Sequence, residues 1–303
     1  MGKGHFLSKM KAIYISIGLI STIFFVCLAQ IDQMTSPIGK ITSDDIYQRQ
    51  KILENLYDTK NRKIAQELKT LSNHPWAGTY KRDFGFGSEN LNIAPQAGFS
   101  YSELSCTGYM YKVGTVKEEK NSIKTKMDYP PPILGQRISE LIPIRWGKRQ
   151  YLIYKKEMMD FVNHINAGDE PCIKDGECDF YMRTGDRKIS VQGHPKLPLP
   201  YSQYLLKKPI KAEMIDFHTS DTADHKREKE KKITIILNAG RSLGVFPGMA
   251  FYGIHPIDKW FPAIVIQVDE DRSIAMIDKF IDTNSSVETP KIGWQFSTKR
   301  RPD

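Results

Sequence analysis

Residues 76–111 read WAGTYKRDFGFGSENLNIAPQAGFSYSELSCTGYMY, and this stretch decides the fold class. Short runs of aromatic and alternating residues follow one another, and glycine or proline separates them. Such runs, bounded by turn residues, are typical of antiparallel strands. We expect strands at 76–80, 91–94, 98–101 and 108–111, arranged as a β-meander.

The same texture continues further along the chain. Strand patterns return at 142–154 and at 180–193, with a short helix at 155–166 that ends before Gly168. We therefore predict a mainly β protein, whose first β-rich domain, an antiparallel meander or barrel, covers residues 73–224.

A run of charges, HKREKEKK at 225–232, interrupts these patterns. Such runs are usually solvated, so we interpret this one as a linker between domains. The apolar runs that follow it are short and leave no room for long helices. We expect them to form a small C-terminal β-barrel over 233–303.

Before the β region, residues 43–72 predict one amphipathic helix. Its apolar residues recur at helical spacing, Ser43 suits the N-cap, and two aspartates follow in the first turn. This helix either packs on its own domain, which we favour, or forms a coiled-coil or membrane-proximal stalk. The apolar positions are Ile46, Leu53, Leu56, Tyr57, Ile64, Leu68 and Leu71.

The N-terminus carries eighteen residues without a charge, AIYISIGLISTIFFVCLA at 12–29, behind Lys3, Lys9 and Lys11. A basic flank before an apolar run is typical of an export signal whose N-terminus stays inside. The length of the run favours an uncleaved membrane helix, whereas the small residues Cys27 and Ala29 favour cleavage at 29. Both alternatives place the rest of the chain outside the cytoplasm, in the periplasm or anchored to the membrane.

Composition narrows the partners of the exported part. The formal net charge is +9, and the three lysines before the apolar run leave +6 for the remainder. A modest excess of this kind permits attraction to anionic surfaces. Nucleic acid is excluded as a partner, since the chain is exported and shows no binding motif.

Cys172 and Cys178 frame the sequence IKDGE, in which Asp175-Gly176 signals a tight turn. Two cysteines across a turn, in an exported chain, predict a disulfide. A metal site is the rival interpretation, but no second pair of cysteines or histidines completes one. We predict no metal and no cofactor, and we expect Cys106 to be a buried small apolar residue.

No catalytic residues are predicted. The chain has no Gly-x-Ser-x-Gly, His-Glu-x-x-His or Walker motif. The spacing does not single out Cys106 with a histidine as a thiol and its base; His74 and His194 are the candidates. Carboxylates of the β region also offer acid–base partners, namely Asp83, Glu103 and Asp186.

Aromatic residues are concentrated in the first β-rich domain. They have two interpretations: a packed β core, which we favour, or the lining of a cavity for a small apolar ligand. The residues concerned are Trp76, Tyr80, Phe84, Phe99, Tyr101, Tyr109 and Trp146.

These motifs also support a resemblance. Residues 73–210 resemble a group of uncharacterised exported bacterial proteins with a Trp-x-Gly-x-Tyr strand, a Gly-x-Gly turn, Leu-x-Ile-Ala-Pro and a Cys-x-Gly-Tyr strand; Arg145-Trp146-Gly147 and Asn166–Pro171 match a later part. Residues 76–80 are also similar to the first strand of lipocalin-like barrels. The C-terminal Gly-Val-Phe-Pro-Gly-Met is similar to small β-barrel modules of envelope and flagellar-assembly proteins. The resemblance implies an interaction fold and no activity.

The sequence thus predicts a non-catalytic cell-envelope protein that binds a small apolar ligand or an envelope protein partner. An envelope hydrolase acting on glycans or peptides is one alternative. A structural assembly component is another, supported by the helix at 43–72 and the membrane segment.

Overall fold

The computed structural model describes residues 43–85, 87–106, 108–128, 140–171, 178–221, 230–255, 262–281 and 291–300. The predicted export segment at 12–29 lies outside these ranges. Among the residues described, no helix combines the length and apolar character that a membrane span requires. By its contacts the chain divides between Ile52 and Leu53, and all strands belong to the second unit.

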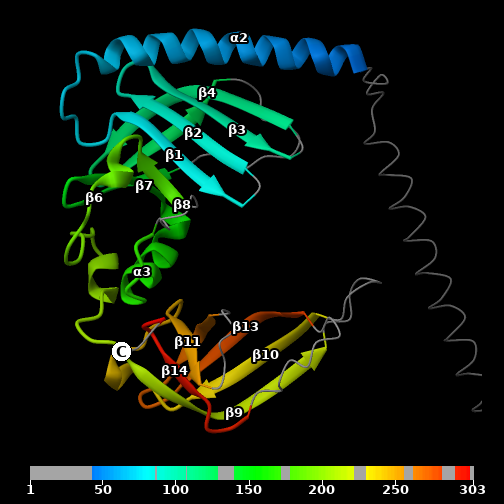
Figure 1. Ribbon diagram of the computed structural model, residues 1–303, viewed down its shortest axis with the longest axis vertical. Helices are drawn as coiled ribbons and strands as arrows, with labels where there is room; N and C mark the ends of the chain where they lie inside the picture. Colours follow the sequence, from blue (N-terminus) through cyan, green and yellow to red (C-terminus); the bar gives the residue numbers. More distant parts are fainter. Residues whose placement is uncertain are drawn as a thin grey trace, which may run out of the picture. The chain divides into compact units, whose positions relative to one another are not determined.

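The expected mainly β fold is confirmed, with two closed barrels (Figure 1). In the first barrel each strand pairs antiparallel with the next in sequence, and the eighth closes onto the first. The strands are β1 (Gly78–Phe84), β2 (Gly87–Ala94), β3 (Gly98–Ser105), β4 (Gly108–Glu119), β5 (Ser122–Met127), β6 (Glu140–Trp146), β7 (Arg149–Tyr154) and β8 (Cys178–Arg183).

Two glycines allow neighbouring strands of this barrel to approach closely. A Cβ on Gly98, whose φ is +87°, would lie 2.1 Å from the carbonyl oxygen of Gly114. A Cβ on Gly114 would lie 2.0 Å from that of Lys126. Because no side chain fits at either position, glycine is required where β3, β4 and β5 bend around the barrel.

Helix α2 (Ser43–Leu68) matches the predicted amphipathic helix. From Leu53 onward it packs against the outer face of β2, β3 and β4, as Figure 1 also shows. The ring of Tyr57 packs at a tilt against that of Tyr111, with ring centroids 4.9 Å apart, and the Glu67 carboxylate accepts hydrogen bonds from the backbone N–H groups of Gln96 and Ala97. For this part of the helix, packing on its own domain is the observed arrangement.

A second helix, α3 (Met158–Asn166), covers the outer face of β6, β7 and β8. A short 3-10 turn at Lys155–Glu157 leads into it, and Gly168, with φ +76°, ends it as predicted. Its apolar side chains pack on those of the strands, a cluster that includes Ile142, Ile144, Trp146, Tyr151, Ile153, Phe161, Val162, Ile165, Phe180 and Met182.

The second barrel is smaller. Its strand order is β10, β13, β12, β11, β14, β9, and β9 closes onto β10. The strands are β9 (Lys211–Asp221), β10 (Glu230–Leu237), β11 (Ala250–His255), β12 (Ala263–Val268), β13 (Ser273–Ile281) and β14 (Gln295–Ser297). An apolar core fills it, including Met214, Ile235, Leu237, Phe251, Val265 and Phe296.

The charge run at 225–232 does not separate the barrels. The strand before it, β9, and the strand after it, β10, are hydrogen-bonded neighbours, with Lys231 opposite Asp221. Residues 230–232 of the run belong to β10, and both of these strands belong to the second barrel. The boundary between the barrels therefore falls before Lys211 rather than at 225–232.

Helix α3 also contacts the second barrel. The Asn163 side chain donates to the carbonyl of Gly248 at 2.9 Å and accepts from the backbone N–H of Ala250 at 3.0 Å. Two backbone groups next to β11 are thus satisfied by one buried amide. The contact fixes α3 between its own strands and β11.

Candidate functional site

The register of β1 to β4 places residues in rows across the first barrel. Tyr80 lies opposite Leu91, Leu91 opposite Tyr101, and Tyr101 opposite Lys112. Residues directly opposite one another point to the same face of a sheet. This is the inner face, because Tyr80, Leu91 and Tyr101 are buried together in one core cluster.

Two residues along each strand, the next inner row is charged. It runs Arg82, Glu89, Glu103, Met110. Arg82 opposite Glu89 is a favourable pair, but Glu89 opposite Glu103 sets two carboxylates against each other. Like charges in directly opposed positions destabilise a sheet. The inner row therefore contains an arrangement that folding alone does not favour.

Two tyrosine hydroxyls donate to these two carboxylates, and a third tyrosine hydroxyl contacts one of the two donors. Tyr101 donates to Glu103 at 2.7 Å, and Tyr181 on β8 donates to Glu89. The hydroxyls of Tyr154 on β7 and Tyr181 lie 3.3 Å apart. Since the Tyr181 proton is directed at Glu89, Tyr154 is the donor in that contact. We call these five residues, together with Lys112, the inner polar cluster.

The tyrosines of the inner polar cluster hold their protons firmly. Burial raises the pKa of Tyr101, and the negative charges of Glu89 and Glu103 raise it further. Burial likewise raises the pKa of Tyr181, with Tyr154 and Glu89 adding to the effect. Burial also raises the pKa of Tyr154. These hydroxyls therefore remain neutral donors at physiological pH.

Lys112 brings a positive charge to the same place. It is 8% exposed, and its ammonium lies 4.7 Å from the centroid of the Tyr101 ring. Burial lowers its pKa, while Glu103 and Glu89 act in the opposite direction. An ammonium over an aromatic face beside carboxylates is a favourable cation–π arrangement.

Arg82 is paired just beyond the cluster. Its guanidinium lies 3.3 Å from the Glu157 carboxylate, and both side chains are about one-fifth exposed, at 22% and 18%. Burial by itself would lower the pKa of Arg82, but Glu157 and Glu89 outweigh it and raise that pKa. Burial raises the pKa of Glu157 despite this pairing.

The aromatic residues named from the sequence lie in different places. Four belong to the inner core of the first barrel: Trp76, Tyr80, Phe99 and Tyr101. Phe84 is half-buried at the end of β1, Trp146 packs in the outer cluster with α3, and Tyr109 is 61% exposed. Tyr109 is thus no part of a core or cavity lining.

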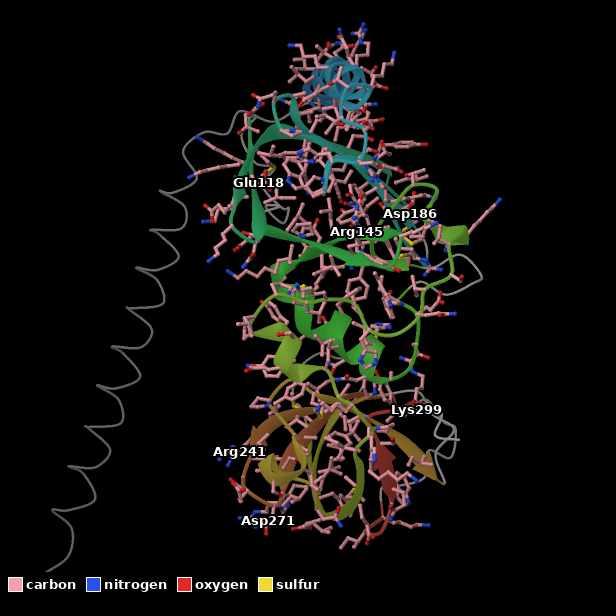
Figure 2. The ribbon with its side chains drawn as sticks, turned by 90° about the vertical axis from the view of Figure 1, so that its left-hand side faces the viewer. Glu118, Arg145, Asp186, Arg241, Asp271 and Lys299 are labelled. Atoms are coloured by element: carbon pink, nitrogen blue, oxygen red, sulfur yellow. The ribbon has the colours of Figure 1, made fainter. Side chains whose placement is uncertain are left out.

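The three carboxylates suggested as acid–base partners are not brought together. Asp83 pairs with Lys81 at 2.8 Å, and Asp186 accepts a hydrogen bond from the backbone N–H of Gln150 at 2.8 Å. Figure 2 shows Asp186 near Arg145, and both act electrostatically on Tyr80. Glu103 lies instead directly opposite another carboxylate, that of Glu89.

The suggested thiol–histidine pairs find no support either. Cys106 is exposed, which corrects the expectation that it is buried. His74 caps a turn, since its Nδ1 accepts from the backbone N–H of Ala77 at 3.1 Å, and His194 is exposed. Cys178 is buried at the start of β8, but Cys172 lies outside the described residues, so the disulfide stays a prediction.

Most of the inner polar cluster could not be recognised from sequence patterns. Glu89, Lys112, Tyr154 and Tyr181 lie on four different strands, and only the register brings them together. Alternation from Tyr80 and Leu91 would have placed Arg82 and Glu89 on the inner face. Within the described ranges, no group of acidic, histidine and cysteine side chains is arranged to hold a metal ion.

Comparison of the chain with protein-family models, curated proteins and solved structures gave no match. The inner polar cluster must therefore be interpreted from its own chemistry.

Proposed function

We propose that this protein is an exported, non-catalytic binding protein of the cell envelope, and that its first barrel binds a small ligand at the inner polar cluster. Eight-stranded antiparallel barrels have an interior of the size that side chains fill or that holds one small ligand. The observation that carries the proposal is the opposed pair Glu89 and Glu103 on the inner face.

This pair supports binding because two opposed carboxylates destabilise the fold, and a role in binding would explain why they are present. Burying charged and polar groups is unfavourable unless each is satisfied, and binding sites commonly hold such groups at the expense of stability.

The binding test uses N-phenyl-1-naphthylamine, an uncharged probe that fluoresces in apolar surroundings, and the full chain in lipid nanodiscs. Met110 lies opposite Glu103 and faces the same side. Met110→Trp should obstruct the inner face and remove most of the saturable signal. Met110→Leu, which conserves volume, should keep it. Fluorescence from probe dissolved in the lipid of the disc is the same for all variants, so it cancels when the variants are compared. Equal signals in both folded variants would contradict the proposal.

Export is supported by the lysine-flanked apolar run at 12–29. A reporter enzyme that is active only outside the cytoplasm, fused after Asp303, should be active. Cytoplasmic retention of this fusion would contradict the envelope location.

The same carboxylate pair favours one second candidate, an envelope hydrolase. Two neighbouring carboxylates are the machinery of glycoside hydrolysis. Release of reducing ends from purified cell-wall glycan, lost in both Glu89→Gln and Glu103→Gln, would support this candidate. No release by the wild-type chain would rule it out for that substrate.

A further inference from the structure

The contact between α3 and the second barrel includes one arginine, Arg300, which follows β14. Its backbone N–H donates to the carbonyl oxygen of Ala167 at 3.2 Å, and its guanidinium lies 3.0 Å from the Asp169 carboxylate. The same guanidinium lies over the ring of Tyr252 on β11, 4.9 Å from the ring centroid. Arg300 therefore connects the end of α3 to the second barrel.

A histidine of α3, His164, lies among these groups. Its carbonyl oxygen accepts from the backbone N–H of Asp169 at 3.1 Å, and its Nε2 lies 3.4 Å from the Asp179 carboxylate on β8. Its ring packs edge-on against the ring of Phe180, with centroids 5.5 Å apart. Its Nδ1 is buried and has no hydrogen-bond partner in the described part of the chain.

We propose that His164 is a pH-sensitive switch at the contact between the two barrels. The contact is closed while His164 is neutral, and it opens when His164 takes up a proton.

The position of the second proton is the first reason. A neutral imidazole has one donor and one acceptor nitrogen, whereas both nitrogens of the cation are donors. Since Nε2 lies beside the Asp179 carboxylate, Nε2 carries the proton of the neutral ring. The second proton must then be bound by Nδ1, where a charged donor would be buried without an acceptor. Such a donor is unfavourable, so the protonated ring of His164 must move out of its packing to reach water.

The charges around His164 are the second reason. In the described ranges, the charged groups that face it are Asp179 on β8, Arg300, and Asp169 and Asp160 from the helix and its end. The pKa of His164 is lowered from its ordinary value of 6.5, chiefly because the ring is buried. The charge of Arg300 lowers this pKa further, and the three carboxylates offset these two effects only in part.

Arg300 carries the effect of this proton to the second barrel. A protonated His164 would place a second cation near the Asp169 carboxylate, which now pairs with Arg300 alone. Asp179 is 52% exposed, so water and salt screen its attraction for the imidazolium. Repulsion between His164 and Arg300 therefore weakens the connection from α3 to Tyr252.

The direction of the pH dependence follows from linkage. A histidine whose pKa is lower in the closed form than in the open form favours closure above its ordinary value of 6.5, and this effect is lost as pH falls. Asp160 acts in the opposite sense, because burial raises its pKa and a proton there stabilises the folded form. Opening on acidification is therefore expected from His164 and not from Asp160.

Hydrogen–deuterium exchange, measured amide by amide on the full chain in lipid nanodiscs, tests the switch. The backbone N–H groups of Ala250 and Arg300 report the contact, because both donate to α3 or to its end. The N–H of Val265 donates to Met249 within the second barrel and is the internal reference. Each rate is divided by that of an unstructured chain at the same pH, which removes the intrinsic effect of pH.

Protection of the two reporting amides should fall several-fold between about pH 7.5 and about pH 5, the range in which histidine changes its charge. The limit is about 30-fold, set by one histidine with an ordinary pKa in the open form. Protection of Val265 should not change.

Two histidine variants provide the comparison. His164→Gln keeps a neutral amide beside Asp179 and removes the titration, so protection of the reporting amides should not depend on pH. His218→Gln is the matched control, because His218 also lies beside an aspartate, Asp216 at 3.8 Å, but is 72% exposed in the second barrel. This control should behave like the wild type.

Three results would overturn the proposal: constant protection in the wild type, an equal loss in His164→Gln, or an equal loss at Val265, which would mean that the second barrel itself unfolds. If His164→Gln does not fold, an NMR titration of the His164 ring in the wild type decides. Its midpoint should lie below the ordinary histidine value and coincide with the loss of protection. A midpoint at or above that value would also overturn the proposal.

Discussion

The two barrels differ in what their inner faces hold. The second barrel is filled by apolar side chains such as Met214, Leu237 and Phe251. In the first, a charged row lies next to the apolar one, and buried Lys112 points inward. An apolar filling is therefore sufficient to close a barrel in this chain. The charged row of the first barrel needs a reason other than folding, and the proposed binding of a ligand would supply one.

The largest expected effects come from removing one large core side chain in each barrel. They test whether both barrels depend on their apolar cores to the same extent. Trp76 is 1% exposed in the first barrel, and Phe251 is fully buried in the second. Trp76→Ala and Phe251→Ala should each lower the free energy of unfolding by about 3–5 kcal/mol, through lost burial and a cavity. Denaturant unfolding measures both. Unchanged unfolding of Trp76→Ala alone would mean that Trp76 lines a ligand site instead of a core.

The next effect concerns a covalent difference between the barrels. We expect a Cys172–Cys178 disulfide at the start of β8, and Cys178→Ala should then cost about 2–4 kcal/mol of stability. Cys106→Ala is the control, because Cys106 is exposed and should change little. Thiol counting on the unfolded, unreduced chain should leave 172 and 178 unlabelled. Labelling of both would refute the pairing.

Half-buried and exposed ion pairs give a third, smaller contrast. Arg82→Met leaves the half-buried Glu157 without its partner and should cost about 1–3 kcal/mol near neutral pH. Arg272→Met in the second barrel breaks a pair with Asp269 whose side chains are 60% and 41% exposed, and should cost at most about 0.5 kcal/mol.

The cost of Arg82→Met should depend on pH with a definite sign. Burial raises the pKa of Glu157, and Arg82 opposes this, so removal of Arg82 raises that pKa further. A carboxyl whose pKa is raised by folding stabilises the folded state when protonated and loses this effect as pH rises through the folded value. The variant should therefore approach the wild type near about pH 4 and fall behind near about pH 7. A constant difference across this range would contradict the burial of Glu157.

Much of the fold could be predicted from local sequence. The meander, the helix at 43–72 and the helix at 155–166 all follow from periodicity and turn residues. The boundary between the two barrels could not be predicted in this way, because a charge run has the same composition in a linker between domains as beside two paired strands.

The candidate site was mostly beyond the sequence. Tyr101 and Glu103 were named from it, but for separate reasons. Glu89 and Tyr181 are 92 positions apart, and their contact depends on closure of β8 onto β1. Local patterns fix which face a residue takes within its strand. They do not fix which strands close the barrel, and that decides which charges meet.

The smallest expected effect is the interaction energy between Glu89 and Glu103, on which the comparison of the two barrels depends. Glu89 and Glu103 repel each other, but each also attracts a cation and accepts a tyrosine proton, so a single substitution mixes several terms. A double-mutant cycle with Glu89→Gln and Glu103→Gln removes these terms and leaves the pair's own energy.

We expect this pair energy to be unfavourable to folding by about 0.2–1 kcal/mol, the range for directly opposed pairs on a sheet. The control cycle, Arg82→Met with Glu89→Gln, concerns oppositely charged residues in the same row and should have the opposite sign. Unfolding at low salt measures both cycles, because salt weakens the interaction in each. A favourable energy for the Glu89–Glu103 pair would mean that the two opposed carboxylates do not oppose folding. The charged row would then need no explanation beyond folding.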